Sequence, residues 1–218
     1  MKNKLINMLG YSLTFLIIAS CSGEGNDISN SIDDSEYLWY FSGKLNGEPF
    51  VYGQKANESI ATYEISTSNT QPSTCVNSSN NGFSYNSGVY PSFDDSLPSM
   101  DIEFNRMHIC SEGSQNDLFD GLFDEKSYDF AMNNNDIDEN AGKVALFYYP
   151  NVNSIYGYKT YNGDQSGSFF KVTSSTQYQG SSLKRLLKGE FSATFYKENN
   201  LSDKVEITDG RFKIVFIP

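Results

Sequence analysis

Histidine is almost absent from this chain, because His108 is its only histidine in 218 residues. A zinc site with two histidines, including the metalloprotease motif H-E-x-x-H, is therefore excluded. The glycine-rich phosphate loop and the G-x-S-x-G nucleophile turn are also missing. A general-base role for His108 competes with an ordinary packed or surface position. We therefore predict a non-enzymatic protein with no catalytic residue, no metal and no cofactor.

Basic residues are also scarce. The chain has 16 lysines and arginines against 27 aspartates and glutamates, which gives a formal charge of −11. Nucleic acid is an improbable partner on this basis, because its phosphates require basic patches. A domain lying flat on an anionic lipid surface is disfavoured for the same reason.

The chain has no apolar run long enough to span a membrane. Its longest apolar stretch, residues 13–19, is broken upstream by polar residues, whereas a spanning helix needs about 20 consecutive apolar residues. Lys2 and Lys4 precede this stretch, and a polar, acidic segment follows it. This order is typical of a secretory signal peptide, which we place at residues 1–20.

Residues 18–21 (IASC) resemble the bacterial lipobox, with an aliphatic residue and two small residues before a cysteine. The resemblance implies that residues 1–20 are removed and that Cys21 carries a lipid. The chain would then be attached to the membrane through the lipid on Cys21. The alternative is an ordinary cleavage site followed by an incidental cysteine. Removal of Lys2 and Lys4 would change the formal charge from −11 to −13, because residues 1–20 contain no acid.

Only three cysteines are present. If Cys21 is acylated, Cys75 and Cys110 remain as an even pair in an oxidising compartment, which favours a disulfide. Such a bridge would stabilise the fold by roughly 4 kcal/mol in the chain-entropy model. Two buried free thiols are the alternative.

The chain divides into three parts. Residues 21–36 comprise the acylated cysteine and a polar, acidic segment that we interpret as a flexible tether. Residues 37–218 form the predicted domain. Its opening segment, residues 37–45, is rich in aromatics, and Asn46-Gly47 predicts a tight hairpin turn.

The domain is predicted to be mainly β. Further strands are expected at residues 60–66, 83–90, 100–109, 128–132, 143–149, 154–160, 168–173, 191–196 and 205–216. Within residues 100–109, Ile102 and Phe104 alternate with Asp101, Glu103 and Asn105. The apolar positions of the last strand change parity at Asp209-Gly210, which requires a bulge or tight turn.

Two short helices are expected. Residues 116–125 carry apolar side chains at helical spacing, and so do residues 181–188, which contain the chain's one basic patch. The second helix could cover a sheet edge or dock on a partner. Together these patterns predict one domain, either an antiparallel β-sandwich or a curved, barrel-like sheet with one or two short helices.

Residues 40–50 (YFSGKLNGEPF) resemble the opening hairpin of small cell-envelope lipoproteins of the Bacteroidota, and residues 187–196 and 205–212 look like their closing strands. Families of this kind are mostly of unknown function. The resemblance therefore implies a fold and a place in the envelope, most simply the outer membrane, and it transfers no catalytic residue. A single acid, Glu24, follows Cys21 closely, and both the periplasmic and the surface side remain open.

Two ligand classes remain to be weighed. A stretch rich in asparagine and glycine carries five tyrosines that could stack on sugars: Tyr148, Tyr149, Tyr156, Tyr158 and Tyr161. A glycan-binding or glycan-active protein is therefore the alternative to an accessory protein with an envelope protein as its partner. Ordinary cross-strand pairing explains the same residues. Residues 136–140 begin like a calcium loop, but Ala141 and Phe147 replace the required glycine and glutamate. An irregular calcium site competes there with a solvated acidic loop.

Overall fold

The protein is a single antiparallel sheet that folds into two layers. The computed structural model describes residues 32–70, 82–107, 119, 121–133, 136, 142–154 and 157–217. These described residues form eleven strands: β1 (Tyr37–Leu45), β2 (Glu48–Lys55), β3 (Tyr63–Thr70), β4 (Gly82–Pro91), β5 (Ser99–Met107), β6 (Ser127–Tyr128), β7 (Lys143–Tyr149), β8 (Tyr158–Lys159), β9 (Phe169–Tyr178), β10 (Ser181–Lys197) and β11 (Asn200–Phe216). This confirms the predicted mainly β, antiparallel domain.

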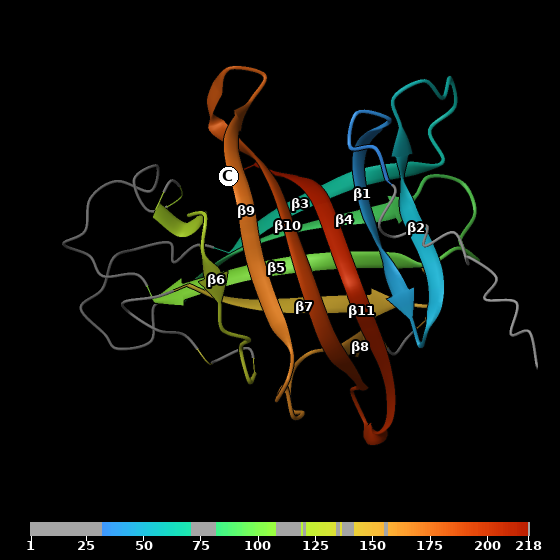
Figure 1. Cartoon of the computed structure of the whole chain (residues 1–218), viewed down its shortest axis with the longest axis vertical. Helices are drawn as coiled ribbons and strands as arrows, with labels where there is room; N and C mark the ends of the chain where they lie inside the picture. Colours follow the sequence, from blue (N-terminus) through green and yellow to red (C-terminus); the bar gives the residue numbers. More distant parts are fainter. Residues whose placement is uncertain are drawn as a thin grey trace, which may run out of the picture.

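The strands follow one path, β2-β1-β11-β10-β8-β7-β5-β4-β3, and β9 and β6 extend from β10. In Figure 1, β9, β10, β11, β1 and β2 run steeply across β7, β5, β4 and β3, which lie behind them. The short strand β8 joins the two groups by pairing with both β10 and β7. We refer to these groups as the front layer and the back layer.

The core lies between the layers and is built largely of aromatic rings. Phe104 on β5 is fully buried and makes edge-on contacts with four rings at centroid distances of 5.0–5.7 Å; they belong to Phe123, Tyr128, Phe170 and Phe216. Edge-to-face pairs of this kind add to the hydrophobic stabilisation of a core. Both layers contribute these rings, so the core depends on the bend in the sheet.

The two predicted turns are confirmed. Asn46 and Gly47, between β1 and β2, have φ angles of 51° and 88°, as a type I′ hairpin requires. On β11, Gly210 pairs with Phe191 but Ile207 pairs with Ala193, so β11 has one extra residue at Asp209. Asp209 has a φ of 52°, which is a feature of a β-bulge.

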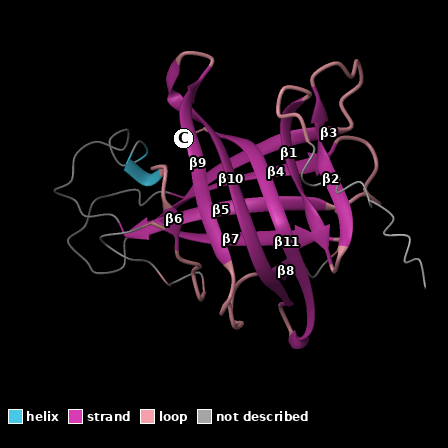
Figure 2. Cartoon of the chain, viewed as in Figure 1, coloured by secondary structure: helices cyan, strands magenta, loops and turns pink. Residues whose placement is uncertain are grey.

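Of the two predicted helices, one is present. Phe119, Gly121 and Leu122 are helical, and Phe119 and Leu122 are buried, as their spacing indicates (Figure 2). The helix predicted at residues 181–188 is wrong, because these residues begin β10. Strand β10 pairs with β9 on one side and β11 on the other, and this pairing overrides a local helical pattern.

Strand positions were predicted more closely than strand lengths. The strand at residues 143–149 is found as β7. Of the described residues in the strand predicted at 154–160, only Tyr158 and Lys159 form a strand, β8, and of those predicted at 128–132 only Tyr128 belongs to one, β6. Strands β10 and β11 have 17 residues each, longer than expected.

Asp34, which the sequence places in the tether, is held on the outer surface of the front layer. Its carboxylate pairs with Lys188 at 2.9 Å and with Arg211 at 3.7 Å, and it accepts a hydrogen bond from the Tyr40 hydroxyl. The Lys213 ammonium donates to the Asp34 carbonyl at 2.8 Å. Strands β1, β10 and β11 therefore all hold this residue.

Candidate functional site

The outer surface of β5 carries polar side chains that are unusually well buried. Successive residues of a strand point to opposite faces, and Met100, Ile102 and Phe104 point into the core. The intervening residues face outward, yet Asp101 is only 5% exposed and Asn105 only 3%. Buried polar groups outside the main core are the first structural indication of a site.

Two chain segments cover part of this surface. The backbone next to β6 runs beside β7, where the Ala131 amide donates to the Val144 carbonyl. The residues after β8 join that segment, because the Asn162 amide donates to the Met132 carbonyl.

Tyr161 lies across the outer surface and reaches Glu103. Its hydroxyl donates a 2.8 Å hydrogen bond to the Glu103 carboxylate, and its ring meets Phe147 edge-on at 5.6 Å. Ala131 and Ala145 are fully buried beside it. Their small side chains leave space for the tyrosine ring close to the sheet.

Asp101 occupies a niche that only glycine leaves open. Its cross-strand neighbour on β4 is Gly88, and a Cβ atom at Gly88 would lie 2.0 Å from Asp101 Oδ1. Burial, the largest effect, raises the pKa of Asp101 to about 6; a hydrogen bond from Tyr90 acts against this rise, and the nearby Glu103 adds to it. The Oδ1 atom itself is buried and has no hydrogen-bond partner in the part of the chain that the structure describes.

Three tyrosines surround these acids. Burial is the main cause that raises the pKa values of Tyr90, Tyr149 and Tyr161, and Asp101 or Glu103 raises each of them further. The phenols therefore stay protonated and act as hydrogen-bond donors. Tyr149 pairs with Ser99 on β5, and Tyr90 follows Val89, the partner of Met100 on β5, so both tyrosines lie near the start of β5.

Asn105 completes the group. Its side chain interacts with Tyr161 and lowers the pKa of that hydroxyl. Among the described residues, neither its amide nitrogen nor its amide oxygen has a partner with hydrogen-bond geometry. We call Tyr90, Asp101, Glu103, Asn105, Tyr149 and Tyr161 the β5 outer cluster.

The predicted tyrosines divide between the two faces of the sheet. Tyr149 and Tyr161 belong to the β5 outer cluster, but Tyr148 is buried in the core against Tyr52 and Tyr158. The Tyr158 hydroxyl donates to Asp203 on β11 at 2.9 Å. The five tyrosines therefore do not share one surface among the positions described; Tyr156 lies outside the described residues.

Other predicted site residues also lie outside the described part of the chain, namely Cys21, Cys75, Cys110 and His108. At the start of the calcium-like segment, Asp136 is ion-paired with Lys143 and accepts a hydrogen bond from the Met132 amide at 2.8 Å. Within the described ranges, no group of three or more histidine, cysteine, aspartate or glutamate side chains could hold a metal ion.

Sequence reasoning did not single out Tyr90, Asp101, Glu103 and Asn105 as site residues. The sequence did contain part of the information, because the alternation along residues 100–105 puts Asp101, Glu103 and Asn105 on one face of the strand. An alternating polar face is ordinarily solvated, however, and only the covering segments reveal its burial.

Comparisons of the chain with protein-family models, with curated proteins and with solved structures found no match. Among the residues that the structure describes, no helix is long and apolar enough to cross a membrane. The geometry of the β5 outer cluster is therefore the evidence on which a function can be argued.

Proposed function

We propose that this protein is a lipid-anchored component of a bacterial cell envelope, attached through Cys21, and that its β domain binds a partner without catalysing a reaction. The signal-like residues 1–20 and the lipobox-like residues 18–21 support the anchor. The resemblance to Bacteroidota envelope lipoproteins supports the outer membrane as the location, on either its periplasmic or its surface side. The scarcity of histidine supports a binding role over a catalytic one.

The ligand that best fits the β5 outer cluster is a glycan. The observation that carries this proposal is the burial of Asp101 and Asn105 beside three tyrosines, with side-chain polar atoms that have no partner among the described residues. Carboxylate and amide groups bind sugar hydroxyls as acceptors and donors, and tyrosine rings offer apolar faces for the sugar ring. Buried polar atoms without partners favour a ligand that can supply hydrogen bonds.

The entry to this cluster is formed by its less buried members. Tyr90, Glu103 and Tyr149 are each partly exposed, whereas Asp101 and Asn105 are buried. A sugar would first contact the Tyr90 and Tyr149 rings, and a shift of these rings would then bring its hydroxyls to the buried acceptors. This order predicts that Tyr149 contributes strongly to affinity.

A glycan array followed by titration calorimetry tests the proposal. The variants Tyr149→Ala and Glu103→Gln should each weaken binding of an array hit about tenfold, since hydrogen bonds to charged groups and stacked rings are each worth about 1–3 kcal/mol. Tyr178→Ala, at a partly exposed position on β9 in the front layer, is the matched control and should bind normally.

A blank array, or equal losses in Tyr149→Ala and Tyr178→Ala, would contradict the glycan assignment. The anchoring half of the proposal is tested separately by the mass of the mature amino terminus. A lipid-modified Cys21 is expected there, and an unmodified terminus at another residue would contradict it.

A further inference from the structure

One end of the domain collects exposed apolar side chains. Four large hydrophobic residues lie on the segments at this end: Leu38, Ile60, Phe93 and Val152 are 40%, 71%, 82% and 42% exposed. They come from the start of β1 and from the loops after β2, β4 and β7. In Figure 1 these loops and the beginning of the described chain all lie toward the right-hand side.

Backbone hydrogen bonds join these segments into one surface. The Ser92 amide donates to the Thr62 carbonyl at 3.0 Å, and the Val152 amide donates to the Asp95 carbonyl at 3.0 Å. The Ala56 amide donates to the Glu36 carbonyl at 2.8 Å, which ties the segment before β1 to the loop after β2. We call this surface the apolar loop end, defined by Leu38, Ile60, Phe93 and Val152.

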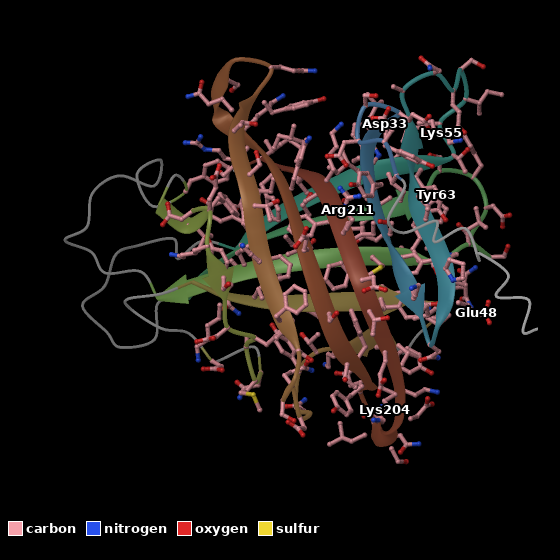
Figure 3. The ribbon with its side chains drawn as sticks, viewed as in Figure 1. Asp33, Glu48, Lys55, Tyr63, Lys204 and Arg211 are labelled. Carbon is pink, nitrogen blue, oxygen red and sulfur yellow. The ribbon has the colours of Figure 1, made fainter. Side chains whose placement is uncertain are left out.

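The tether reaches the domain at this same end. Asp34 is fastened by Lys188, Arg211 and Lys213, so the chain length between lipid and domain is that from Cys21 to Asp34. These 13 steps have a root-mean-square reach of about 20 Å as a flexible coil. Figure 3 shows Asp33, Lys55 and Tyr63 toward this end of the molecule, while Lys204 lies at the tip of the β10–β11 hairpin, away from them.

We propose that the apolar loop end rests on the lipid bilayer that holds the Cys21 anchor, with Phe93 inserted deepest. The inference rests on the anchoring proposed above. A short tether keeps the loop end at a high effective concentration next to the membrane, so a small apolar surface suffices for contact. Exposed hydrophobic clusters are typical of membrane or protein contact sites, and a single anchor is strengthened by a second membrane signal.

The charges at this end decide which bilayer it favours. Asp33, Glu58, Asp94 and Asp95 are all exposed on the same segments. Acidic groups are repelled by an anionic leaflet, so the loop end favours a bilayer surface of low charge. The contact is thus apolar at its tips and limited in depth by the surrounding carboxylates.

Depth-dependent fluorescence quenching tests this orientation. The lipidated mature chain, which begins at Cys21, is placed in phosphatidylcholine vesicles that contain brominated acyl chains, with Phe93→Trp as probe and Leu201→Trp as matched control. Leu201 is 49% exposed on the β10–β11 hairpin, so both tryptophans occupy surface sites. After subtraction of the Trp39 signal, Phe93→Trp should be quenched at least twofold more than Leu201→Trp.

Equal quenching of the two probes in a protein whose Cys21 is shown by mass to carry lipid would overturn this inference and leave the anchoring intact. A chain with no lipid on Cys21 would overturn both. Replacement of half the phosphatidylcholine by phosphatidylglycerol should lower the quenching of Phe93→Trp. Stronger quenching in that anionic bilayer would overturn the assignment of a low-charge surface.

Discussion

The Ser87 hydroxyl on β4 donates a 2.6 Å hydrogen bond to the main-chain carbonyl of Val215 on β11. Ser87 is fully buried and Val215 is 2% exposed, and the two residues are 128 positions apart in the sequence. The bond therefore links the back layer directly to the front layer. In a mostly aromatic core, it fixes a specific contact between two strands that do not pair.

Ser87→Ala should lower the free energy of unfolding by about 1–2 kcal/mol, because the Val215 carbonyl loses a buried donor. Urea unfolding should show a lower midpoint with an unchanged slope. Ser66→Ala, at an exposed position on β3, is the control for removing a serine hydroxyl from this layer. Equal midpoints for the two variants would show that the hydrogen bond adds no net stability.

Local patterns in the sequence were sufficient to predict most of the strands and both turns. Alternation identified the inward and outward residues of β5, and the parity change at Asp209-Gly210 identified the bulge on β11. Asn46-Gly47 identified the first hairpin because its backbone conformation is a property of those two residues. Such features depend on neighbours in sequence and are therefore visible in it.

Contacts between distant segments were not visible in this way. No periodicity relates Ser87 to Val215, and the burial of Asp101 arises where Gly88 and Tyr90 of β4 pack against it. The helix predicted at residues 181–188 failed for the same reason, because pairing with β9 and β11 decides the conformation of that segment. The candidate site was thus predictable in its tyrosines Tyr149 and Tyr161 but not in its acids.

Asp101 should make the domain less stable as the pH rises through mildly acidic values. Its pKa is raised from 3.8 to about 6 in the folded state, so the folded state binds the proton more tightly than the unfolded state. The stabilisation is complete below pH 3.8 and is lost as the pH rises through about 6. The total change is about 3 kcal/mol by the relation between pKa and free energy.

Asp101→Asn removes this titration. Urea unfolding at several pH values should show the wild type losing about 2 kcal/mol relative to Asp101→Asn between pH 4 and pH 7. Glu64→Gln, at an exposed position on β3, is the control for removing a carboxylate from the back layer. A difference between wild type and Asp101→Asn that is constant with pH would contradict the assignment of a raised pKa.

Gln54 joins the two ends of the sheet path, β2 and β3, which do not pair as strands. Its side-chain oxygen accepts hydrogen bonds from the amides of Thr62 at 2.8 Å and Tyr63 at 3.2 Å, and the residue is 4% exposed. Gln54→Ala should destabilise the domain by about 2 kcal/mol, because the buried Tyr63 amide loses its acceptor. Gln54→Glu keeps an acceptor at this position and should retain part of the stability.

The local effect is measured by hydrogen exchange. The amides of Thr62 and Tyr63 should lose protection in Gln54→Ala, while core amides of β10 should change only by the global loss of stability. Unchanged protection of the Tyr63 amide in Gln54→Ala would show that another group maintains the contact between β2 and β3.

Asp34→Asn should loosen the tether end from the front layer. Burial raises the pKa of Asp34, but the hydrogen bonds from Tyr40 and Lys188 and the charges of Lys188 and Arg211 outweigh it, and the net pKa is lowered. The stabilisation is therefore present above pH 3.8 and is lost as the pH falls through the folded-state pKa. Because these groups are partly solvated and screened, the loss at neutral pH should be about 1 kcal/mol.

Asp33→Asn is the matched control for this network. Asp33 is exposed and accepts its hydrogen bonds from Ser35, two residues away. The destabilisation of Asp34→Asn should shrink in 1 M salt and disappear under acid, whereas Asp33→Asn should leave the unfolding midpoint near that of the wild type. Equal effects of both variants would argue against a specific role of Asp34.

Reduction should destabilise the domain if Cys75 and Cys110 are bridged. Thr70, five residues before Cys75, and Asn105, five residues before Cys110, both pair with Ser84 on β4. One strand, β4, separates β3 from β5, which corresponds to about 10 Å.

A disulfide that closes the loop between Cys75 and Cys110 should stabilise the domain by roughly 4 kcal/mol. A reductant should therefore lower the melting temperature of the wild type by several degrees. Cys75→Ser should lower the melting temperature equally, and this variant should no longer respond to the reductant. A wild type whose melting temperature and gel mobility are unchanged by reductant would show that the two thiols are not linked.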